Sequence, residues 1–275
     1  MFAMKDHSDR DSNADAANHL RRIRVIPTLL ITSSGGLVKT VRFKNRTYIG
    51  DPINAVRIFN EKGVDELVLL DIDASREGRE PNYQAIEEIV SEAFMPIAYG
   101  GGVTSVNQMA QLFRCGLEKV VLCTAVHSNP RLIAEAAARF GSQSLVVCLD
   151  VKRQWLSGPR LRIKGGTVGA GIQPVEFARQ VVDAGAGELL VYSIDRDGTY
   201  EGYDLELLRS ISSAVTVPVI ACGGARGIED FQAAVHGAGC SAVAAGSVFV
   251  YKEKKQGVLI NYPTIDPRQF STLSA

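Results

Sequence analysis

The chain repeats itself at a spacing of 122 residues. The segment ELVLLDIDASREG, which starts at Glu66, aligns with ELLVYSIDRDGTY, which starts at Glu188, and 188 − 66 = 122. The same spacing places MPIAYGGGV on VPVIACGGA, and VVLCTAV on AVAAGSV. Three segments that agree at one spacing indicate a duplicated structural unit. The repeat therefore predicts a fold made of two equivalent halves.

Between Arg24 and Val250, short apolar runs alternate with amphipathic stretches of helical period. ELVLLDID precedes NYQAIEEIVSEAF, and KVVLCTA precedes PRLIAEAAARFG. Strands rich in Val, Ile and Leu that are each followed by a helix are typical of parallel βαβ units. About eight such units fit here, the number that closes a (β/α)8 TIM barrel. We predict one barrel over residues 23–275, including a C-terminal extension, after a mobile tail at residues 1–22.

The composition excludes several classes of protein. Lys and Arg total 30 and Asp and Glu total 30, so bulk charge favours neither nucleic acid nor a membrane surface as a partner. No apolar run approaches the roughly 20 residues of a membrane span, and the N-terminus lacks a signal-peptide core. The five cysteines are scattered without a CxxC pair, which favours a reducing cytoplasm. We expect a cytoplasmic protein without a metal site or a cofactor.

Two Gly-Gly pairs occupy equivalent places in the halves. Gly101–Gly102 and Gly223–Gly224 each follow a strand and precede a helix, where backbone N–H groups can approach an anion. The next strand of each half ends in further donors, at Cys123–Thr124 and Gly246–Ser247. Chemistry in such barrels lies at these carboxyl strand ends. The pattern indicates two phosphate cradles and a long ligand with a phosphate at each end.

The opening strands of the two halves differ at their ends. In RVIPTLLITSSGG the strand ends on Leu30, whereas in SLVVCLDVKR it ends on Asp150, and 150 − 30 = 120. The two positions are therefore equivalent strand ends. Only one half carries a group that could transfer a proton there.

From Arg24 to about Phe249 the chain resembles HisF, the cyclase subunit of imidazole glycerol phosphate synthase. The motifs that carry the resemblance are DELVLLDIDAS, YGGGV, FGSQSLVVCLDVKR, GAGELLVYSIDRDGTYEGYDLELL and VPVIACGGA. The resemblance implies a glutaminase partner of the HisH type on the amino-terminal face of the barrel. Ammonia would pass through the barrel to a bisphosphate ribonucleotide imine at the opposite face. It also implies that a ring of alternating charges guards the barrel floor, at Arg24, Glu66, Lys119 and Glu188.

The phosphate and catalytic positions of the family carry over in part. Cys123 stands where the family has asparagine, and Lys39 matches a ligand-contacting lysine on a mobile flap. Of the two aspartates that the family uses as general acid and base, Asp150 is present and Leu30 replaces the other. Asp73, at the end of the second strand, and Asp197 are possible assistants. The matching phosphate positions are Gly101, Gly102, Thr124, Gly198, Gly224, Gly246, Ser247 and Lys39.

Details also resemble a divergent HisF-like branch of acetamidino-modification proteins of surface-polysaccharide biosynthesis. The segments that carry this likeness include PTLLI and AFMPIAYGGG. In that branch the barrel supplies ammonia to a separate amidotransferase that acts on an N-acetylated sugar. One hypothesis is therefore an ammonia-conducting subunit in which the cradles bind a phosphorylated effector or a nucleotide sugar. The other is a true cyclase of histidine biosynthesis that uses Asp150; an unrelated phosphosugar isomerase rests on fold analogy alone.

Overall fold

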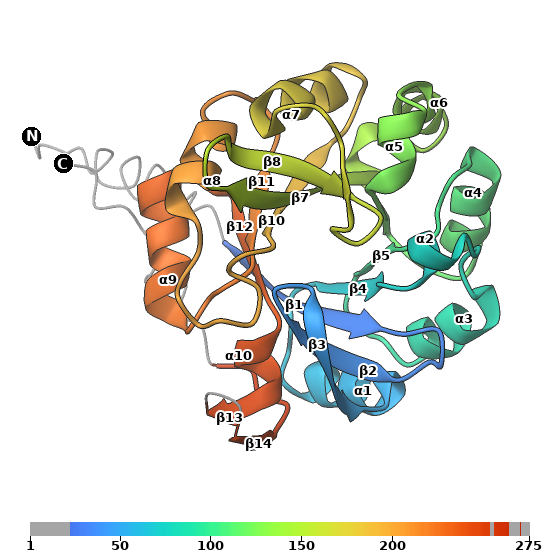
Figure 1. Cartoon of the computed structure of the whole chain (residues 1–275). Helices are drawn as coiled ribbons and strands as arrows, with labels where there is room; N and C mark the ends of the chain where they lie inside the picture. The colour runs from blue at the N-terminus through green and yellow to red at the C-terminus, as the bar shows by residue number, and fades with distance from the viewer. Residues whose placement is uncertain (1–22, 254–255, 264–269, 271–275) are drawn as a thin grey trace, which may run out of the picture.

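Eight parallel strands close into a barrel in the computed structural model, which describes residues 23–253, 256–263 and 270. Strand β12 pairs with β1 in parallel register and so completes the circle (Figure 1). This confirms the predicted (β/α)8 fold, whereas residues 1–22 lie outside the described part. The barrel strands, in spatial order, are β1 (Arg24–Ile31), β4 (Leu67–Asp71), β5 (Ile97–Gly100), β6 (Lys119–Leu122), β7 (Leu145–Gln154), β10 (Glu188–Ser193), β11 (Val219–Cys222) and β12 (Ala242–Ala245).

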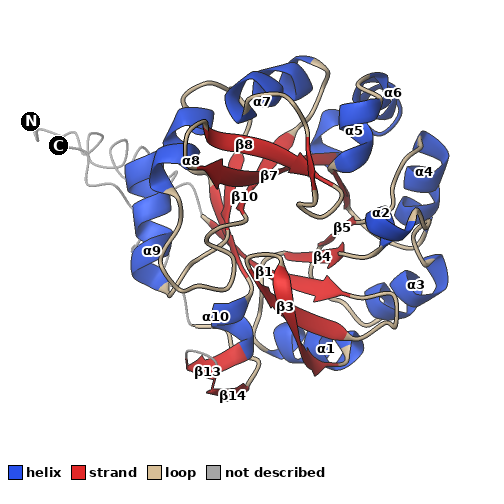
Figure 2. Ribbon diagram, viewed as in Figure 1, coloured by secondary structure: helices blue, strands red, loops and turns tan. Residues whose placement is uncertain are grey.

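Helices surround the strands on the outside of the barrel (Figure 2). Side-chain caps mark where several begin: Asp51 accepts a hydrogen bond from the Asn54 amide, and Ser105 forms a capping box with Gln108. None of the helices in the described ranges is long and apolar enough to cross a membrane. The helices are α1 (Pro52–Glu61), α2 (Ala74–Glu77), α3 (Tyr83–Ser91), α4 (Val106–Arg114), α5 (Thr124–Ser128), α6 (Arg131–Phe140), α7 (Pro174–Asp183), α8 (Leu205–Ser212), α9 (Ile228–Gln232, continued by a π-helical turn, Ala233–Gly237), α10 (Ser247–Val250) and a 3₁₀ turn, Ser142–Ser144.

The strand register reproduces the sequence repeat. Leu30 pairs with Leu70 in the first half, and Asp150 pairs with Tyr192 in the second. Leu70 and Tyr192 differ by 192 − 70 = 122, the spacing of the repeat. Leu30 and Asp150 are therefore equivalent in space as well as in sequence.

Alternation along each strand separates an inner from an outer apolar layer. On β1, Val25, Leu29 and Ile31 pack outward against the helices, whereas Ile26 belongs to the cluster inside the barrel. The residues of β1 on the inner face are thus Arg24, Ile26, Thr28 and Leu30, in order from the amino-terminal rim to the mouth. The inner face of β1 therefore contributes one residue to each layer of the barrel interior, from the amino-terminal rim to the mouth.

Extra strands project from the barrel in hairpins. Strands β2 (Leu37–Val41) and β3 (Lys44–Gly50) form a hairpin in the first βα connection, joined by Arg42 and Phe43, both with positive φ. Two residues in the left-handed region give the turn twist that antiparallel strands favour. The remaining strands are β8 (Gly158–Ile163) and β9 (Val168–Gly169) beside β7, and β13 (Tyr251–Glu253) with β14 (Gln256–Val258).

The C-terminal segment returns to the first strand. The amide of Asn261 donates to the carbonyl of Phe249, and the Tyr262 hydroxyl donates to the carbonyl of Val25 at 3.0 Å. The rings of Phe249 and Tyr262 lie 5.4 Å apart. This contact places Tyr262 beside the residue that follows Arg24.

Candidate functional site

Four charged side chains form a closed ring at the amino-terminal rim of the barrel. Arg24 contacts Glu66 at 2.5 Å and also pairs with Glu188. Lys119 lies 3.0 Å from a carboxylate oxygen of Glu66 and 3.0 Å from one of Glu188. Each acid thus bridges both cations, and each cation bridges both acids. These four residues, predicted to form a charged ring, lie together because each stands at the start of its strand or, for Glu66, directly before it.

The acids of this four-residue ring are nearly out of water. Glu66 and Glu188 are 4% and 5% exposed, whereas the side chains of Arg24 and Lys119 are 28% and 21% exposed. Buried carboxylates are tolerated when each is paired and hydrogen-bonded. The ring therefore closes the barrel floor with a neutral set of mutually satisfied charges.

The interior above the ring is lined mainly by apolar side chains, with Thr28 of β1 as a buried polar one. The inner cluster includes Ile26, Val68, Ala98, Ala242 and Ala244, and it reaches Tyr192 and the thiols of Cys148 and Cys222 near the mouth. An ion in contact with these apolar side chains alone would lose its hydration without gaining a partner. A small neutral molecule suffers no comparable penalty.

A cavity of about 370 Å³ opens at the carboxyl ends of the first-half strands. Its wall contains both Leu30 and Asp150, which are 3% and 7% exposed. Other lining residues come from the ends of strands β4 and β6, from the loops after β4, β5 and β6, and from the β2–β3 hairpin. They include Phe43, Leu70, Asp71, Arg76, Arg79, Glu80, Gly101, Gly102, Val121, Cys123 and Thr124.

Asp150 is the candidate proton-transfer group in this cavity. Burial raises its pKa to about 6, although hydrogen bonds from the thiols of Cys148 and Cys123 lower it. The sulfurs lie 3.4 and 3.7 Å from its carboxylate oxygens. A carboxyl group with this pKa can exchange a proton near neutral pH, as a general acid or base requires. Cys148, which the sequence analysis did not single out, faces inward two residues before Asp150 on β7.

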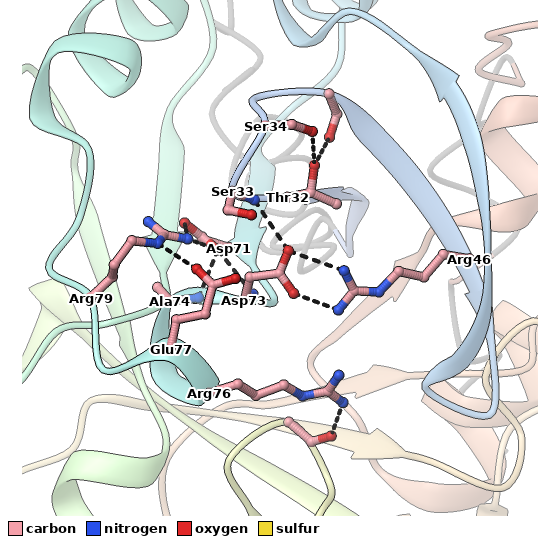
Figure 3. A network of polar contacts seen from close by, with 12 residues as sticks. Thr32, Ser33, Ser34, Arg46, Asp71, Asp73, Ala74, Arg76, Glu77 and Arg79 are labelled. Atoms are coloured by element: carbon pink, nitrogen blue, oxygen red, sulfur yellow. Dashed lines mark hydrogen bonds and ion pairs between the residues drawn. The ribbon is translucent and has the colours of Figure 1, made fainter.

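Asp73 takes a structural role instead of a place in the cavity wall. We expected it at the end of the second strand, but β4 ends at Asp71 and Asp73 lies two residues beyond. Its two oxygens accept hydrogen bonds from Arg46, at 3.0 and 2.5 Å, and one also accepts from the Ser33 amide at 3.1 Å (Figure 3). Burial would raise the pKa of Asp73, but Arg46 outweighs it and the pKa is lowered. An ionised, fully bonded carboxylate is a poor proton donor.

Asp197 anchors the β2–β3 hairpin. Its carboxylate accepts from the Thr40 hydroxyl at 2.6 Å, the Phe43 amide at 3.2 Å and the Tyr192 hydroxyl at 2.9 Å. The rings of Phe43 and Tyr192 meet edge to face at 4.9 Å. Burial raises the pKa of Asp197, and it lies beside the smaller second cradle instead of the cavity that holds Asp150.

The first cradle is open to the cavity. Gly101 and Gly102 have φ values of 128° and 71°, and a Cβ on Gly102 would lie 2.3 Å from the Arg79 carbonyl. Glycine is therefore required for this loop to approach its neighbour. The Thr124 hydroxyl accepts from the Lys164 amide at 3.0 Å and lines the same cavity.

The second cradle is nearly filled. Gly198, Gly224, Gly246 and Ser247 surround a space of about 20 Å³. A Cβ on Gly224 would lie 2.4 Å from the Gly202 carbonyl, so its backbone is also tightly packed. The two cradles are alike in sequence, but only the first opens onto the larger cavity.

The family resemblance implies that Lys39 lies on a mobile flap, and the structure shows it buried in the β2–β3 hairpin of the first βα connection. It lies on β2, is 5% exposed, and its ammonium donates to the Thr28 carbonyl at 2.7 Å. A Cβ added to Gly246 would lie only 1.8 Å from the Lys39 Nζ. Burial lowers the pKa of Lys39 to about 8, against the attraction of Asp197. The lysine thus lies beside Gly246 of the second cradle, on a folded hairpin.

Comparison with known proteins gives one consistent family. The sequence model described as "Histidine biosynthesis protein" matches residues 24–255. A Pseudomonas aeruginosa protein provisionally named imidazole glycerol phosphate synthase subunit hisF2 is 49% identical over 245 residues, covering 89% of this chain and 97% of its own length. A similarly provisional HisF of Leptospira interrogans is 46% identical (90% and 97% covered). The imidazole glycerol phosphate synthase subunit HisF of Hyphomonas neptunium is 44% identical (84% and 91% covered).

We predict that Asp150→Asn stabilises the protein above pH 6. A carboxyl whose pKa is raised by folding contributes stability that is complete below its ordinary pKa near 4 and is lost as pH rises through about 6. At pH 8 the buried charge costs on the order of 2–3 kcal/mol. Thermal unfolding at pH 8 should show a higher Tm for the variant, with little difference at pH 4. The exposed Asp183→Asn is the control, and an equal rise there would contradict the prediction.

We predict that Glu188→Gln destabilises the four-residue ring. Arg24 and Lys119 each lose one carboxylate, and partial exposure of both cations limits the cost to about 1–3 kcal/mol. Urea unfolding measures the change. Adding Lys119→Met should recover part of the loss, because the pair is coupled. Glu92→Gln, which breaks the exposed Arg57–Glu92 pair, is the control and should cost clearly less. An equal cost would show that the ring is not a coupled unit.

Proposed function

Because the chain belongs to the HisF family of histidine biosynthesis proteins, we propose that it is the barrel subunit of a glutamine amidotransferase complex that conducts ammonia without cyclase chemistry of its own. The observation that carries the proposal is Leu30 at the strand end equivalent to Asp150. Cyclisation in this family uses a carboxylate at both positions, one as acid and one as base. A leucine side chain can neither donate nor accept a proton.

Asp73 and Asp197, the two possible assistants, do not compensate for Leu30. Asp73 holds Arg46 and the Ser33 amide, and Asp197 holds three hydrogen-bond donors of its own. Neither lines the cavity that contains Asp150. Losing one general acid–base group typically costs about 10²- to 10⁴-fold in rate.

The ring and the apolar interior support a role in ammonia transfer. We propose that a HisH-type glutaminase docks on the amino-terminal face, beside Arg24 and Lys119, and shifts the ring to let ammonia enter. The lining above favours neutral NH₃ over ammonium, because an ion would be desolvated there. Ammonia would leave at the mouth beside Leu30.

We further propose that a separate amidotransferase receives this ammonia. Its acceptor would be an N-acetylated sugar of a surface polysaccharide, whose acetamido group becomes an acetamidino group. A barrel that only delivers ammonia needs no acid–base pair, which accounts for Leu30.

Asp150 favours a second candidate function, the cyclase reaction of histidine biosynthesis. Its pKa of about 6 and its place in an open cavity beside the first cradle suit general acid–base catalysis. In that case one carboxylate would serve both proton transfers, and the products would be imidazole glycerol phosphate and an aminoimidazole carboxamide ribonucleotide.

We predict no detectable turnover of the bisphosphate imine by the isolated chain in excess ammonium salt. Free ammonia bypasses the glutaminase, so the assay reports only the chemistry of the barrel mouth. Circular dichroism on the same sample establishes that the protein is folded. Turnover within about a hundredfold of ordinary enzyme rates would overturn the proposal in favour of the cyclase.

The matched variant is Leu30→Asp, which restores the missing carboxylate. If Leu30 alone accounts for the lost activity, this variant should gain turnover that depends on Asp150, and Leu30→Asn, of the same size, should gain none. Equal rates for the aspartate and asparagine variants would show that proton transfer at this position is not the missing step.

A further inference from the structure

We infer that the tip of the β7–β8 hairpin, formed by Trp155 and Leu156, is the docking point for an acidic protein partner at the barrel mouth. Taking this partner to be the protein that accepts the ammonia rests on the proposed function. The tip itself is inferred from its exposure, its rigid support and the charge around it.

The tip presents two adjacent large apolar side chains to water. Trp155 is 99% exposed and Leu156 is 95% exposed, and Trp155 is the only tryptophan of the chain. Single exposed apolar residues are common on protein surfaces, but adjacent ones that are almost completely exposed mark a surface suited to contact with another molecule. Tryptophan is also among the residues that most often anchor protein interfaces.

The hairpin carries this tip beyond the barrel, next to the cavity. The pairing of β7 with β10 ends at Val151, and from there β7 continues as a partner of β8. Gly158, with φ of 69°, supplies the left-handed residue that closes the turn. Asp150, on β7, and Gly165, just after β8, both line the cavity, so the hairpin borders its opening.

Arg153, at the base of the tip, fixes the hairpin against α8. Its guanidinium donates to both carboxylate oxygens of Asp204, at 2.7 and 2.9 Å, and to Glu206 at 2.8 Å. Its backbone amide donates to the Asp195 carboxylate at 2.6 Å. The turn of the hairpin accordingly lies beside α8 (Figure 1). A tip held on a fixed stem loses little conformational freedom when it binds, which favours tight docking.

The hairpin and the loop after it are basic. Residues 151–168 contain five basic residues and no acidic one, although the whole chain has no net charge. Among the described residues, only Arg153 of these five forms an ion pair with an acidic side chain. The other four are Lys152, Arg160, Arg162 and Lys164. Their charge is available to a partner that carries carboxylates.

Two of these cations stand directly opposite each other. Lys152 pairs in register with Arg160 across the antiparallel strands, an arrangement that is unfavourable for like charges. The Nη1 group of Arg160 is also shielded from water and has no hydrogen-bond partner in the part of the chain that the structure describes. A carboxylate placed between these two side chains would relieve the repulsion and satisfy this donor. The hairpin therefore fits an acidic surface around an apolar pocket that receives Trp155.

A protein suits this tip better than a second copy of the chain or a lipid surface. Two copies that met at their tips would bring two basic hairpins together, and their like charges would repel. The tip also stands beside the opening at which the proposed function releases ammonia. A protein that takes up this ammonia must contact the rim of the opening, because ammonia that escapes into water is diluted and protonated.

The test first identifies the partner by photocrosslinking in the cells that make this chain. A p-benzoylphenylalanine introduced at Leu156 should capture one protein, which the same group introduced at Phe94 should not capture. Phe94 is the matched position, because it is 90% exposed and lies just before β5, at the opposite rim. Capture of the same protein from both positions, of the glutaminase, or of no protein at Leu156 would overturn the inference.

The captured protein is then purified and titrated with the whole chain by isothermal titration calorimetry. Trp155→Ala should weaken binding at least about tenfold, the loss typical of an interface anchor. Lys152→Glu should also weaken it, because the reversed charge repels an acidic partner. Phe94→Ala and Lys62→Glu, at the end of α1, are the controls and should leave the affinity unchanged. Equal affinity of Trp155→Ala and the unaltered chain would overturn the inference.

The fluorescence of Trp155 tests the two other occupants directly, because the chain has no other tryptophan. We expect no change in its emission when vesicles of phosphatidylglycerol are added, and a monomer in sedimentation equilibrium. A blue shift with the vesicles would identify a lipid surface as the occupant. A dimer that Trp155→Ala dissociates would identify a second copy. Either result would overturn the inference of a protein partner.

The outcomes also separate this inference from the proposed function. A captured protein that needs Trp155 for binding, but whose reaction consumes no ammonia, would leave the docking point in place and overturn the proposed function. A protein that takes ammonia from this chain and binds Trp155→Ala as tightly as the unaltered chain would overturn the inference and leave the ammonia-conducting role in place.

Discussion

Closure of the sheet by the pairing of β12 with β1 is the constraint on which the rest of the molecule depends. A closed parallel barrel brings the first residues of all strands to one rim and the last residues to the other. Arg24, Lys119 and Glu188, far apart in sequence, meet for this reason, and so do Leu30 and Asp150. Alternation of side chains across each strand then decides which residues face the interior.

The sequence predicted this architecture well because its signals are periodic. A spacing of 122 residues and alternating strands and helices are visible without a structure, and the strand registers reproduce them. The charged ring could be predicted only through resemblance to a family, since any one charge at a strand start is unremarkable. The structure shows that all four side chains contact one another.

The hairpin contacts could not be predicted, because they join residues with no periodic relation. Arg46 and Asp73 are 27 residues apart in different connections, and nothing in either segment marks them as partners. The same is true of Lys39 and Thr28. A lysine in a connecting segment is therefore expected to be exposed, although Lys39 is buried. The contact of Cys148 with Asp150 was not predicted, because a cysteine on an inner strand face cannot be distinguished by sequence from an ordinary apolar residue. The halves thus kept a common framework and diverged in the connections above it.

The contact between Tyr262 and the carbonyl of Val25 joins two segments that are 237 residues apart in the sequence. It brings the segment around Tyr262 to the rim that carries the four-residue ring. This segment therefore borders the face where we propose that the glutaminase docks, and a partner that shifts the ring would meet both segments at once.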